Sequence, residues 1–291
     1  NKNKEIAFWG ASPPPIGGMS VHIKRLSFFL KKNGWDVIQY NFKTSKRNEF
    51  YILNVNNIIL WYFMLWFKKS PKIHYIISSS TYVRFLGSLL SLRGKKIIIR
   101  VGGRSLENAL NGNFLERTLT IFSLKLCAGF IGVNADICKL AEKYNIDAKV
   151  NHIPGFIPPH EQANPPFEIK NFFSENGYLK LIITGQIVDE NHEDIYGLFH
   201  ALNTLSSLKK EKFKFKCCIV SYTISGDNKH YVQKFRKKID ELDLKNSVLL
   251  FHNTNELWPI LQLCDIFIRT SKTDGDANSI REALFLKKGV I

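Results

Sequence analysis

A polar, glycine-bearing loop near the end of the chain holds the residues best suited to chemistry. A short apolar run predicts a strand before this loop, and an amphipathic segment after it predicts a helix whose N-cap is Asn278 or Ser279. Asp274 and Glu282 lie eight positions apart across the junction. Carboxylates accept hydrogen bonds from sugar hydroxyls, and amides at a helix N-terminus bind phosphate. The pattern therefore predicts a site for a ligand with both kinds of group, such as a sugar joined to a diphosphate.

Two glycine pairs occupy similar junctions in the first half of the chain. Gly17 and Gly18 follow the first predicted strand, while Gly102 and Gly103 follow a later one and precede Arg104. Glycine allows backbone amides to approach an anion where a helix begins. Neither pair has the spacing of a dinucleotide-binding motif, and a glycine pair is often only a turn. Taken together, the two pairs predict an anion-facing rim.

Metal binding and acid–base catalysis are alternative roles for nearby residues. Asp274 and Asp276 form a D-x-D pair of a kind that holds Mg²⁺ or Mn²⁺ against a diphosphate. His22 stands near the start of a predicted helix, with Met19 close by, so it is the histidine best placed to face an acceptor. A lone histidine is more often structural, so this role for His22 is a hypothesis only.

Short apolar runs that predict strands alternate along the chain with segments of helical period. The strand-like runs are 6–9, 37–40, 73–77, 96–101, 129–133, 150–153, 179–184, 213–220, 248–251, 265–268 and 290 onward. The helical segments are 21–32, 115–126, 136–143, 195–208, 231–242, 256–263 and 279–286. This alternation predicts parallel sheets with helices on both faces. Ligands of such sheets bind beyond the carboxyl ends of the strands, which is where the loops described above lie.

A proline-rich segment interrupts this alternation. Five of the ten prolines fall within residues 152–167, and such a density is typical of a linker. We therefore expect an α/β protein with two Rossmann-like domains facing a cleft. The domains span residues 1–155 and 169–291, and the linker spans residues 156–168.

Positive charge is concentrated in the first domain. Residues 1–155 carry 23 Lys and Arg against 8 Asp and Glu, whereas residues 156–291 carry 18 against 17. The excess predicts an anionic partner, and the aromatic stretch 58–69, which ends in two lysines, favours a membrane surface. A buried helix packed on a sheet is the alternative for that stretch. No nucleic-acid-binding motif appears, so we expect no nucleic-acid partner.

The composition argues against other classes of protein. Hydrophobic residues make up 45% of the chain and charged residues 23%, as in globular proteins. No apolar run reaches transmembrane length, and no secretory signal precedes the first strand. The five cysteines lack the spacing of a metal site and predict reduced thiols. We therefore expect a cytoplasmic protein.

The whole chain resembles the retaining glycosyltransferases of family 4, which have the GT-B fold. The acidic pair has the spacing of that family's E-x7-E signature, with Asp274 in the first place. Looser matches are the Gly17–Gly18 loop and residues 130–134, 152–157, 182–186 and 281–283. The resemblance implies an acceptor-side first domain, a second domain that binds a nucleotide sugar, and a role in bacterial cell-surface polysaccharide (capsule or O-antigen) synthesis.

The resemblance also implies roles for individual residues. Asp274 would be the catalytic residue that contacts the donor sugar, and Glu282 would hold the ribose. The donor-binding set is Gly17, Gly18, Gln186, Asn191, Arg269, Lys272, Gly275, Asp276, Ala277, Asn278, Ser279 and Glu282. The acceptor-side set is Met19, His22, Gly102, Gly103 and Arg104. The family works without a metal, so we expect no cofactor beyond the nucleotide-diphosphate sugar as co-substrate.

The chain departs from the family's pattern in two respects. Members place an arginine and a lysine in the loop where this chain has Gln186 and Asn191. Negative charge develops on the leaving diphosphate, so losing two cations is costly unless Arg269, Lys272 or a residue of the first domain replaces them. The chain also ends at Ile291, before the strands and helix with which members continue, so we expect an incomplete C-terminal domain.

Three functions remain open at this stage. We expect a retaining hexosyltransferase that moves a sugar to a hydroxyl of a lipid-linked glycan, at the inner face of the cytoplasmic membrane. The missing cations favour, as an alternative, a non-catalytic GT-B partner that binds glycan or lipid for another transferase. A sugar-nucleotide epimerase of related fold is a weaker third.

Overall fold

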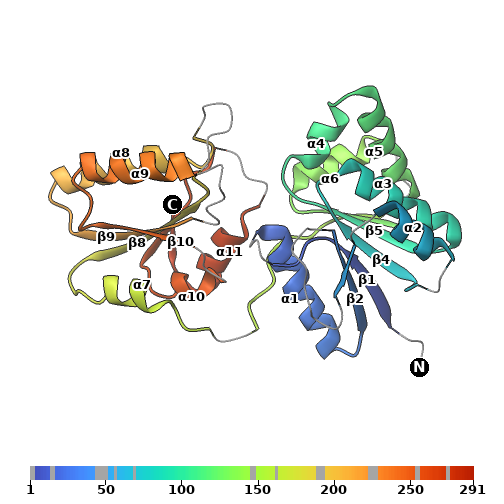
Figure 1. Cartoon of the computed structure of the whole chain (residues 1–291), viewed down its shortest axis with the longest axis horizontal. Helices are drawn as coiled ribbons and strands as arrows, with labels where there is room; N and C mark the ends of the chain where they lie inside the picture. Colours follow the sequence, from blue (N-terminus) through green and yellow to red (C-terminus); the bar gives the residue numbers. More distant parts are fainter. Residues whose placement is uncertain are drawn as a thin grey trace. The chain divides into compact units, whose positions relative to one another are not determined.

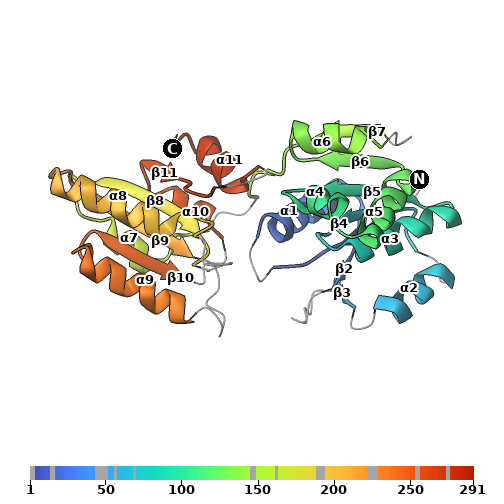
Figure 2. The ribbon, with the colours of Figure 1, turned by 90° about the horizontal axis from the view of Figure 1, so that it is seen from above.

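The computed structural model describes residues 4–13, 17–42, 52–55, 58–67, 70–144, 149–160, 163–187, 194–221, 229–252, 256–272 and 276–291. The chain divides into two compact units, Asn1–Ile157 and Pro158–Ile291, which we call unit 1 and unit 2 (Figure 1). The division falls within the proline-rich segment. Each unit contains one parallel sheet with helices packed on it (Figure 2).

Unit 1 contains a seven-stranded sheet in which every strand pair is parallel. The strand order is β3-β2-β1-β4-β5-β6-β7. The strands are β1 (Glu5–Trp9), β2 (Asp36–Asn41), β3 (Ile52–Asn54), β4 (Ile73–Ile77), β5 (Lys96–Val101), β6 (Gly129–Gly132) and β7 (Lys149–His152). The helices are α1 (Gly18–Lys32), α2 (Ile58–Phe67), α3 (Thr81–Leu89), the 3-10 helix η1 (Leu90–Arg93), α4 (Ser105–Leu110), α5 (Phe114–Leu126) and α6 (Ala135–Glu142).

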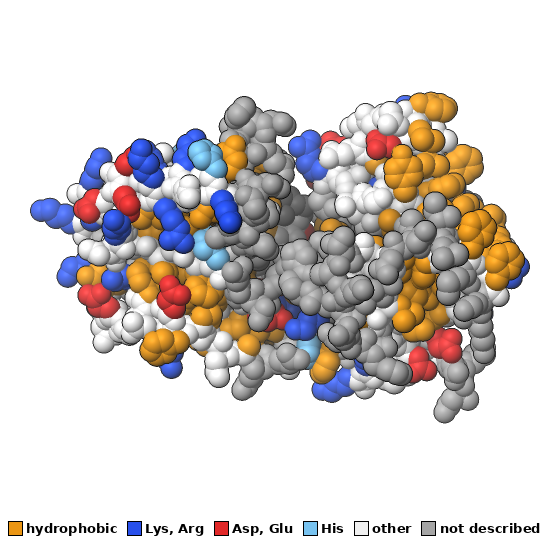
Figure 3. Space-filling model, viewed as in Figure 1, with side chains coloured by type: hydrophobic (Ala, Val, Ile, Leu, Met, Phe, Trp, Pro, Cys, Tyr) orange, Lys and Arg blue, Asp and Glu red, His pale blue; other side chains and the backbone are white. Residues whose placement is uncertain are grey.

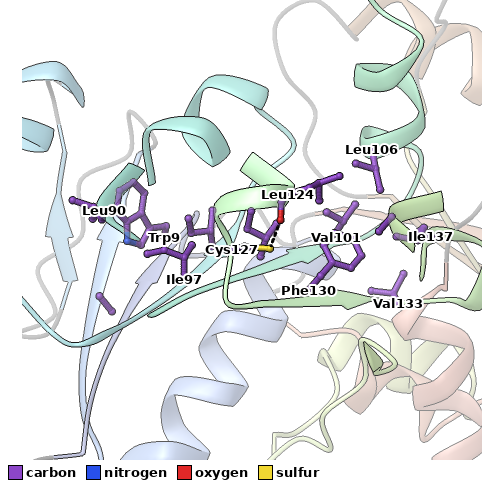
Figure 4. Packing of buried hydrophobic residues seen from close by; sticks show 14 of the residues in the cluster. Trp9, Leu90, Ile97, Val101, Leu106, Leu124, Cys127, Phe130, Val133 and Ile137 are labelled. Atoms are coloured by element: carbon purple, nitrogen blue, oxygen red, sulfur yellow. Dashed lines mark hydrogen bonds between the residues drawn. The ribbon is translucent and has the colours of Figure 1, made fainter. Parts of the chain in front are cut away.

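Side chains of this sheet enter two separate cores because successive strand residues point to opposite faces. Trp9 of β1 belongs to one cluster with residues of α2, α3 and α5, and Figure 4 shows its packing beside Leu90 and Ile97. Phe8, the neighbour of Trp9, belongs to a second cluster with Ile23 of α1. Helices therefore cover both faces of the sheet, as the alternating pattern predicts.

Unit 2 contains a five-stranded parallel sheet of order β10-β9-β8-β11-β12. Its strands are β8 (Leu179–Gly185), β9 (Phe215–Ser221), β10 (Val248–His252), β11 (Ile266–Ile268) and β12 (Gly289–Val290). Its helices are α7 (Phe167–Phe172), α8 (Leu198–Lys210), α9 (Lys229–Glu241), α10 (Trp258–Leu261) and α11 (Asn278–Phe285). Two clusters again fill the two faces.

The strand order changes direction once in each sheet. From β1 the chain adds β2 and β3 on one side, then returns to place β4 on the other side of β1. In unit 2, β9 and β10 lie on one side of β8, and β11 lies on the other. Ligands of open parallel sheets bind beyond the carboxyl ends of the strands at such switch points. The segments after β1 and β4, and those after β8 and β11, are therefore the expected ligand-binding positions.

The predicted pair of Rossmann-like α/β domains is confirmed, but the sequence reading missed several elements. Strand β3 and helices α3 and α7 were not predicted, whereas α4 begins where the second glycine pair predicts a helix. The stretch predicted as an aromatic helix forms α2, in which Leu65 is buried and Phe67 exposed. Within the described residues, no helix has the length and apolar character needed to cross a membrane.

Candidate functional site

Arg269 lies at the switch point of unit 2, immediately after β11. Its Nη1 donates to the carbonyl oxygen of Thr184 at 3.0 Å and to the Thr184 hydroxyl at 3.2 Å, near the carboxyl end of β8. The guanidinium also lies over the ring of Tyr196, 5.6 Å from its centroid. These contacts hold a positive charge between β8 and β11. Thr184 lies two positions before Gln186, the residue that directly follows β8.

The segment after Arg269 is fixed against the loop that precedes α8. The Thr270 hydroxyl donates to the carbonyl of Tyr196 at 2.6 Å, and the Lys272 amide donates to the carbonyl of Ile195 at 3.1 Å. Gly197 has a φ of +65°, and a Cβ there would collide with the Thr270 carbonyl. Glycine is therefore required at position 197 for the two loops to approach.

Helix α11 begins without the side-chain cap that the sequence predicts. Its N-cap is Ala277 rather than Asn278 or Ser279, and no side chain caps the helix there. Alanine is among the poorest N-cap residues because it has no side-chain oxygen to accept from the first-turn amides. The prediction of the cap residue is therefore wrong, whereas the predicted strand–loop–helix order is correct. A helix that begins this way leaves its N-terminal dipole uncompensated by its own cap.

Two acidic residues of the predicted site have defined surroundings. Arg281 Nε donates to both carboxylate oxygens of Asp276, at 2.6 and 2.9 Å, so Asp276 is held in an ion pair beside the helix start. Glu282 is buried, with 5% of its surface exposed. Burying a carboxylate costs free energy unless it has polar partners, so Glu282 is not an ordinary core residue of α11. Asp274, Gly275 and Asn191 lie outside the described residues.

The first glycine pair lies at the switch point of unit 1. Gly17 is the N-cap of α1, and the Ser20 hydroxyl accepts from the Gly17 amide at 3.1 Å. A Cβ at Gly17 would meet no atom within 4 Å, so open space lies beside this residue. Gly18 and Met19, the first two residues of α1, are exposed. Gly17, Gly18 and Met19, which are predicted to contact the sugar donor or the acceptor substrate, are therefore accessible to a ligand.

His22, a predicted acceptor-side residue, is buried beside the segment that follows β7. Its Nδ1 lies 2.7 Å from the carbonyl oxygen of Gly155, so this nitrogen carries the proton, and its Nε2 lies 3.5 Å from the hydroxyl of Tyr75. Arg25 Nη1 donates to the carbonyl of Ile157 at 2.9 Å. Burial, with the nearby charges of Arg100 and Arg25, lowers the pKa of His22 to about 4. His22 is thus a neutral, buried residue that, together with Arg25, attaches residues 155–157 to α1.

The second glycine pair lies after β5, where a buried arginine that sequence reasoning missed is also found. Gly103 has a φ of +64°, and the exposed Arg104 pairs with Glu107 at 3.2 Å. Arg84 of α3 donates to the Ser105 hydroxyl at 3.4 Å. It also donates to the Ser78 carbonyl, between β4 and α3, at 3.4 Å and to the hydroxyl of Thr81, the first residue of α3, at 3.2 Å. Burial lowers the pKa of Arg84 to about 10, so it remains charged at neutral pH. In the sequence, the feature that could have identified Arg84 is a charged residue within an otherwise apolar segment of helical length.

Thiol and metal chemistry receive no support from the described residues. All five cysteines are buried and unpaired, and burial raises the pKa of Cys127 to about 12. A thiol with a raised pKa is a poor nucleophile and a poor metal ligand. Among the described residues, no group of three or more His, Cys, Asp or Glu side chains is arranged to hold a metal ion.

Comparison with known proteins gives matches among solved structures alone. No family model matches the sequence, and no curated protein matches it. The structure of HepE from Anabaena in complex with UDP superposes with a TM-score of 0.67 at 12% identity, covering 98% of this chain and 79% of HepE. A glycosyltransferase from Rickettsia africae gives 0.65 at 17% identity, covering 99% and 79%. Sucrose-phosphate synthase from Thermosynechococcus elongatus gives 0.74 at 10% identity, covering 99% and 80%.

The chain has the GT-B fold. The matches extend over nearly the whole chain, and both parallel sheets are included in them. At these identities the likeness concerns the fold, and the argument for an activity depends on the residues of the site. In this fold, unit 2 presents Arg269 and the start of α11 at its switch point, and unit 1 presents the Gly17–Gly18 turn and Arg84 at its own.

Proposed function

We propose that this chain is a glycosyltransferase that moves a sugar from a nucleotide-diphosphate donor to a hydroxyl of a glycan acceptor. One observation carries the proposal: helix α11 begins at Asn278 after the N-cap Ala277, without a side-chain cap, at the same edge of the sheet as the guanidinium of Arg269. A helix N-terminus and a nearby cation together favour a diphosphate. The GT-B fold supports the proposal, and HepE, which shares this fold, binds UDP.

The donor is proposed to bind unit 2. The first-turn amides of α11 would contact the phosphates, and the buried Glu282 would accept hydrogen bonds from the ribose hydroxyls. Asp274 would contact the donor sugar. Arg269, with Lys272, would supply the positive charge that the positions of Gln186 and Asn191 lack. Stabilising the charge that develops on the leaving diphosphate is often the largest contribution to such catalysis.

The reaction is proposed to retain anomeric configuration, as the resemblance to family 4 implies. The acceptor hydroxyl would attack from the face that the diphosphate leaves, and a phosphate oxygen would take the acceptor's proton. No residue of this chain need then form a covalent intermediate, and no metal is required. Binding and charge stabilisation would account for most of the rate enhancement.

Unit 1 is proposed to hold the acceptor near the Gly17–Gly18 turn, where there is open space. The acceptor would be a lipid-linked glycan of a cell-surface polysaccharide, met at the inner face of the cytoplasmic membrane. The excess of positive charge in unit 1 supports an anionic surface as a partner.

A panel of UDP-, GDP- and dTDP-sugars tests the proposal by thermal shift and by release of the nucleoside diphosphate. At least one member should raise the melting temperature of the wild-type chain and be turned over. Glu282→Gln keeps the size of the side chain but removes its charge, so it should weaken nucleotide binding. Glu211→Gln, an exposed position in unit 2, is the matched control and should bind as wild type.

A non-catalytic partner of another transferase is the second candidate, because Gln186 replaces an expected cation directly after β8. Such a protein would be stabilised by glycan or lipid, but by no nucleotide sugar, and would turn none over. If no nucleotide sugar of the panel stabilises the wild-type chain, the transferase proposal is rejected. The roles given to the two acidic residues are supported if Asp274→Ala mainly loses turnover while Glu282→Gln mainly loses affinity for the nucleotide sugar.

A further inference from the structure

Large apolar side chains are exposed along one flank of unit 1. Phe114 has 86% of its surface exposed, Phe67 78% and Leu92 66%. We define the aromatic flank as the exposed residues Phe67, Tyr82, Leu92, Phe114, Leu115 and Phe122. Figure 3 shows hydrophobic side chains gathered over the part of unit 1 formed by α2, α3 and α5. Exposed apolar side chains that gather in this way indicate an interaction surface.

The helices that carry the flank belong to one layer. Partly buried residues of α2, α3 and α5 (Trp61, Val83 and Ile121) pack against the same core cluster, on the face of the sheet that Trp9 enters. The guanidinium of Arg93 lies 5.7 Å from the centre of the Trp66 ring and so joins η1 to α2. The six residues of the flank therefore lie on one side of unit 1, although α1, on the other face of the sheet, also exposes Phe28 and Phe29.

Helix α5 buries small polar residues beside Leu124 and exposes two phenylalanines. Its buried positions include Thr120 and Ser123, each with 1% of its surface exposed. Phe114 and Phe122 lie eight positions apart, which places them on one face of the helix, and both are exposed. Helix α3 likewise buries Arg84 and Ser88 while it exposes Tyr82. Aromatic side chains on the outer faces of α3 and α5 are expected where a helix meets an apolar phase.

Positive charge accompanies these apolar residues. Residues 58–126 contain eleven Lys and Arg against two Glu, and of these eleven Arg84 and Arg100 are buried. The exposed Arg117 and Lys125 each follow a flank phenylalanine by three positions, and the exposed Arg93 follows Leu92 directly. Aromatic side chains flanked by Lys and Arg are typical of segments that insert shallowly into anionic bilayers. A second copy of the chain would bring the same positive charge and would be repelled.

We propose that the aromatic flank docks unit 1 on an anionic lipid bilayer, with the phenylalanines inserted at the headgroup level and the cations on lipid phosphates. The inference deepens the proposed function, because it names the surface by which the chain would reach a lipid-linked acceptor. It does not depend on catalysis, since the flank would bind a bilayer whether or not a sugar is transferred.

Vesicle co-sedimentation tests this surface with matched variants. Wild-type chain should sediment with phosphatidylcholine vesicles that contain phosphatidylglycerol, and far less with phosphatidylcholine alone or at high salt. Phe114→Ser with Phe122→Ser should lower the partition coefficient by about tenfold for each phenyl group. The control pair is Phe167→Ser with Phe213→Ser in unit 2, whose side chains are 82% and 59% exposed. These two changes should leave sedimentation unchanged.

Three outcomes would overturn the proposal. The first is failure of the wild-type chain to sediment with the anionic vesicles. The second is an equal loss of binding in the unit 2 pair and the flank pair, which would indicate non-specific adsorption. A concentration-dependent dimer that the flank pair disrupts would instead identify a second copy as the occupant. Thermal melting checks that the flank pair remains folded, and thermal shift with nucleotide sugars separates the two proposals. If the flank pair loses vesicle binding but keeps its thermal shift with nucleotide sugars, the flank is supported as the bilayer-binding surface and the donor site is intact.

Discussion

Acidification should destabilise unit 1 through two buried histidines. The indole N–H of Trp9 donates to His74 Nδ1 at 2.9 Å, and the carbonyl of Pro71 lies 3.0 Å from Nε2, so both nitrogens are committed in the neutral ring. A proton on Nδ1 would oppose the Trp9 N–H. Burial lowers the pKa of His74 to about 4, as it does that of His22, from an ordinary value of 6.5. The folded state therefore resists protonation of both rings, whereas the unfolded chain accepts it.

The direction and size of the effect follow from these pKa values. A pKa that is lower in the folded than in the unfolded chain gives stability that is present above pH 6.5 and is lost as the pH falls towards 4. At pH 5 each histidine should remove about 2 kcal/mol of unfolding free energy relative to pH 8. The two together amount to about 4 kcal/mol, a large part of the roughly 5–15 kcal/mol typical of a folded domain.

Urea unfolding followed by tryptophan fluorescence measures this loss. Four of the five tryptophans lie in unit 1, so the signal reports mainly on that unit. His22→Gln with His74→Gln keeps a donor for Gly155 and an acceptor for Trp9 but removes the titration, so this pair should flatten the pH dependence. His200→Gln, exposed on α8, is the control. The reasoning is refuted if wild type loses less than about 1 kcal/mol between pH 8 and pH 5, or if the double variant loses as much as wild type.

Two further predictions concern the loops around the proposed donor site. Arg269→Met removes the donors to Thr184 and should cost about 1–3 kcal/mol of unfolding free energy. In calorimetric titration it should also weaken nucleotide binding more than Arg104→Met does. Gly197→Ala should destabilise unit 2 by about 3 kcal/mol, since it adds the collision with Thr270 to the cost of a positive φ. Gly177→Ala has the same sign of φ with no atom nearby, so urea unfolding should show a loss of only about 1–2 kcal/mol.

The sequence was informative where a local pattern determines the structure. The apolar runs at 73–77 and 96–101 coincide with β4 and β5, because buried parallel strands are short, continuous and rich in isoleucine. Strand β3 was hidden because it adjoins α2 in one long apolar stretch that has no turn signal other than asparagine. Helix α3 was missed because Arg84 and Gly87 interrupt its apolar pattern, and their burial depends on contacts with distant residues such as Trp9 and Ser105.

The candidate site was predictable in place but not in detail. A strand, a polar loop and a helix located the start of α11, yet the polar residues Asn278 and Ser279 gave no sign that Ala277 would be the N-cap. Local rules choose the residue that best stabilises an isolated helix, and functional sites often depart from them. The burial of His22 depends on Gly155 and Tyr75, which are far from it in the sequence, so no local signal could separate a structural histidine from one that faces a ligand.

The central claim is that the uncapped start of α11 holds a diphosphate, and Ala277→Asp tests it most directly. Aspartate is a favourable N-cap, so the variant should gain about 1 kcal/mol of stability in urea unfolding. Its carboxylate would also occupy the place proposed for the phosphates and repel them. Calorimetric titration with the best nucleoside diphosphate should therefore show at least about a tenfold loss of affinity, or 1.4 kcal/mol, in a more stable protein. Unchanged affinity in the stabilised variant, or no binding by the wild-type chain, would contradict the account.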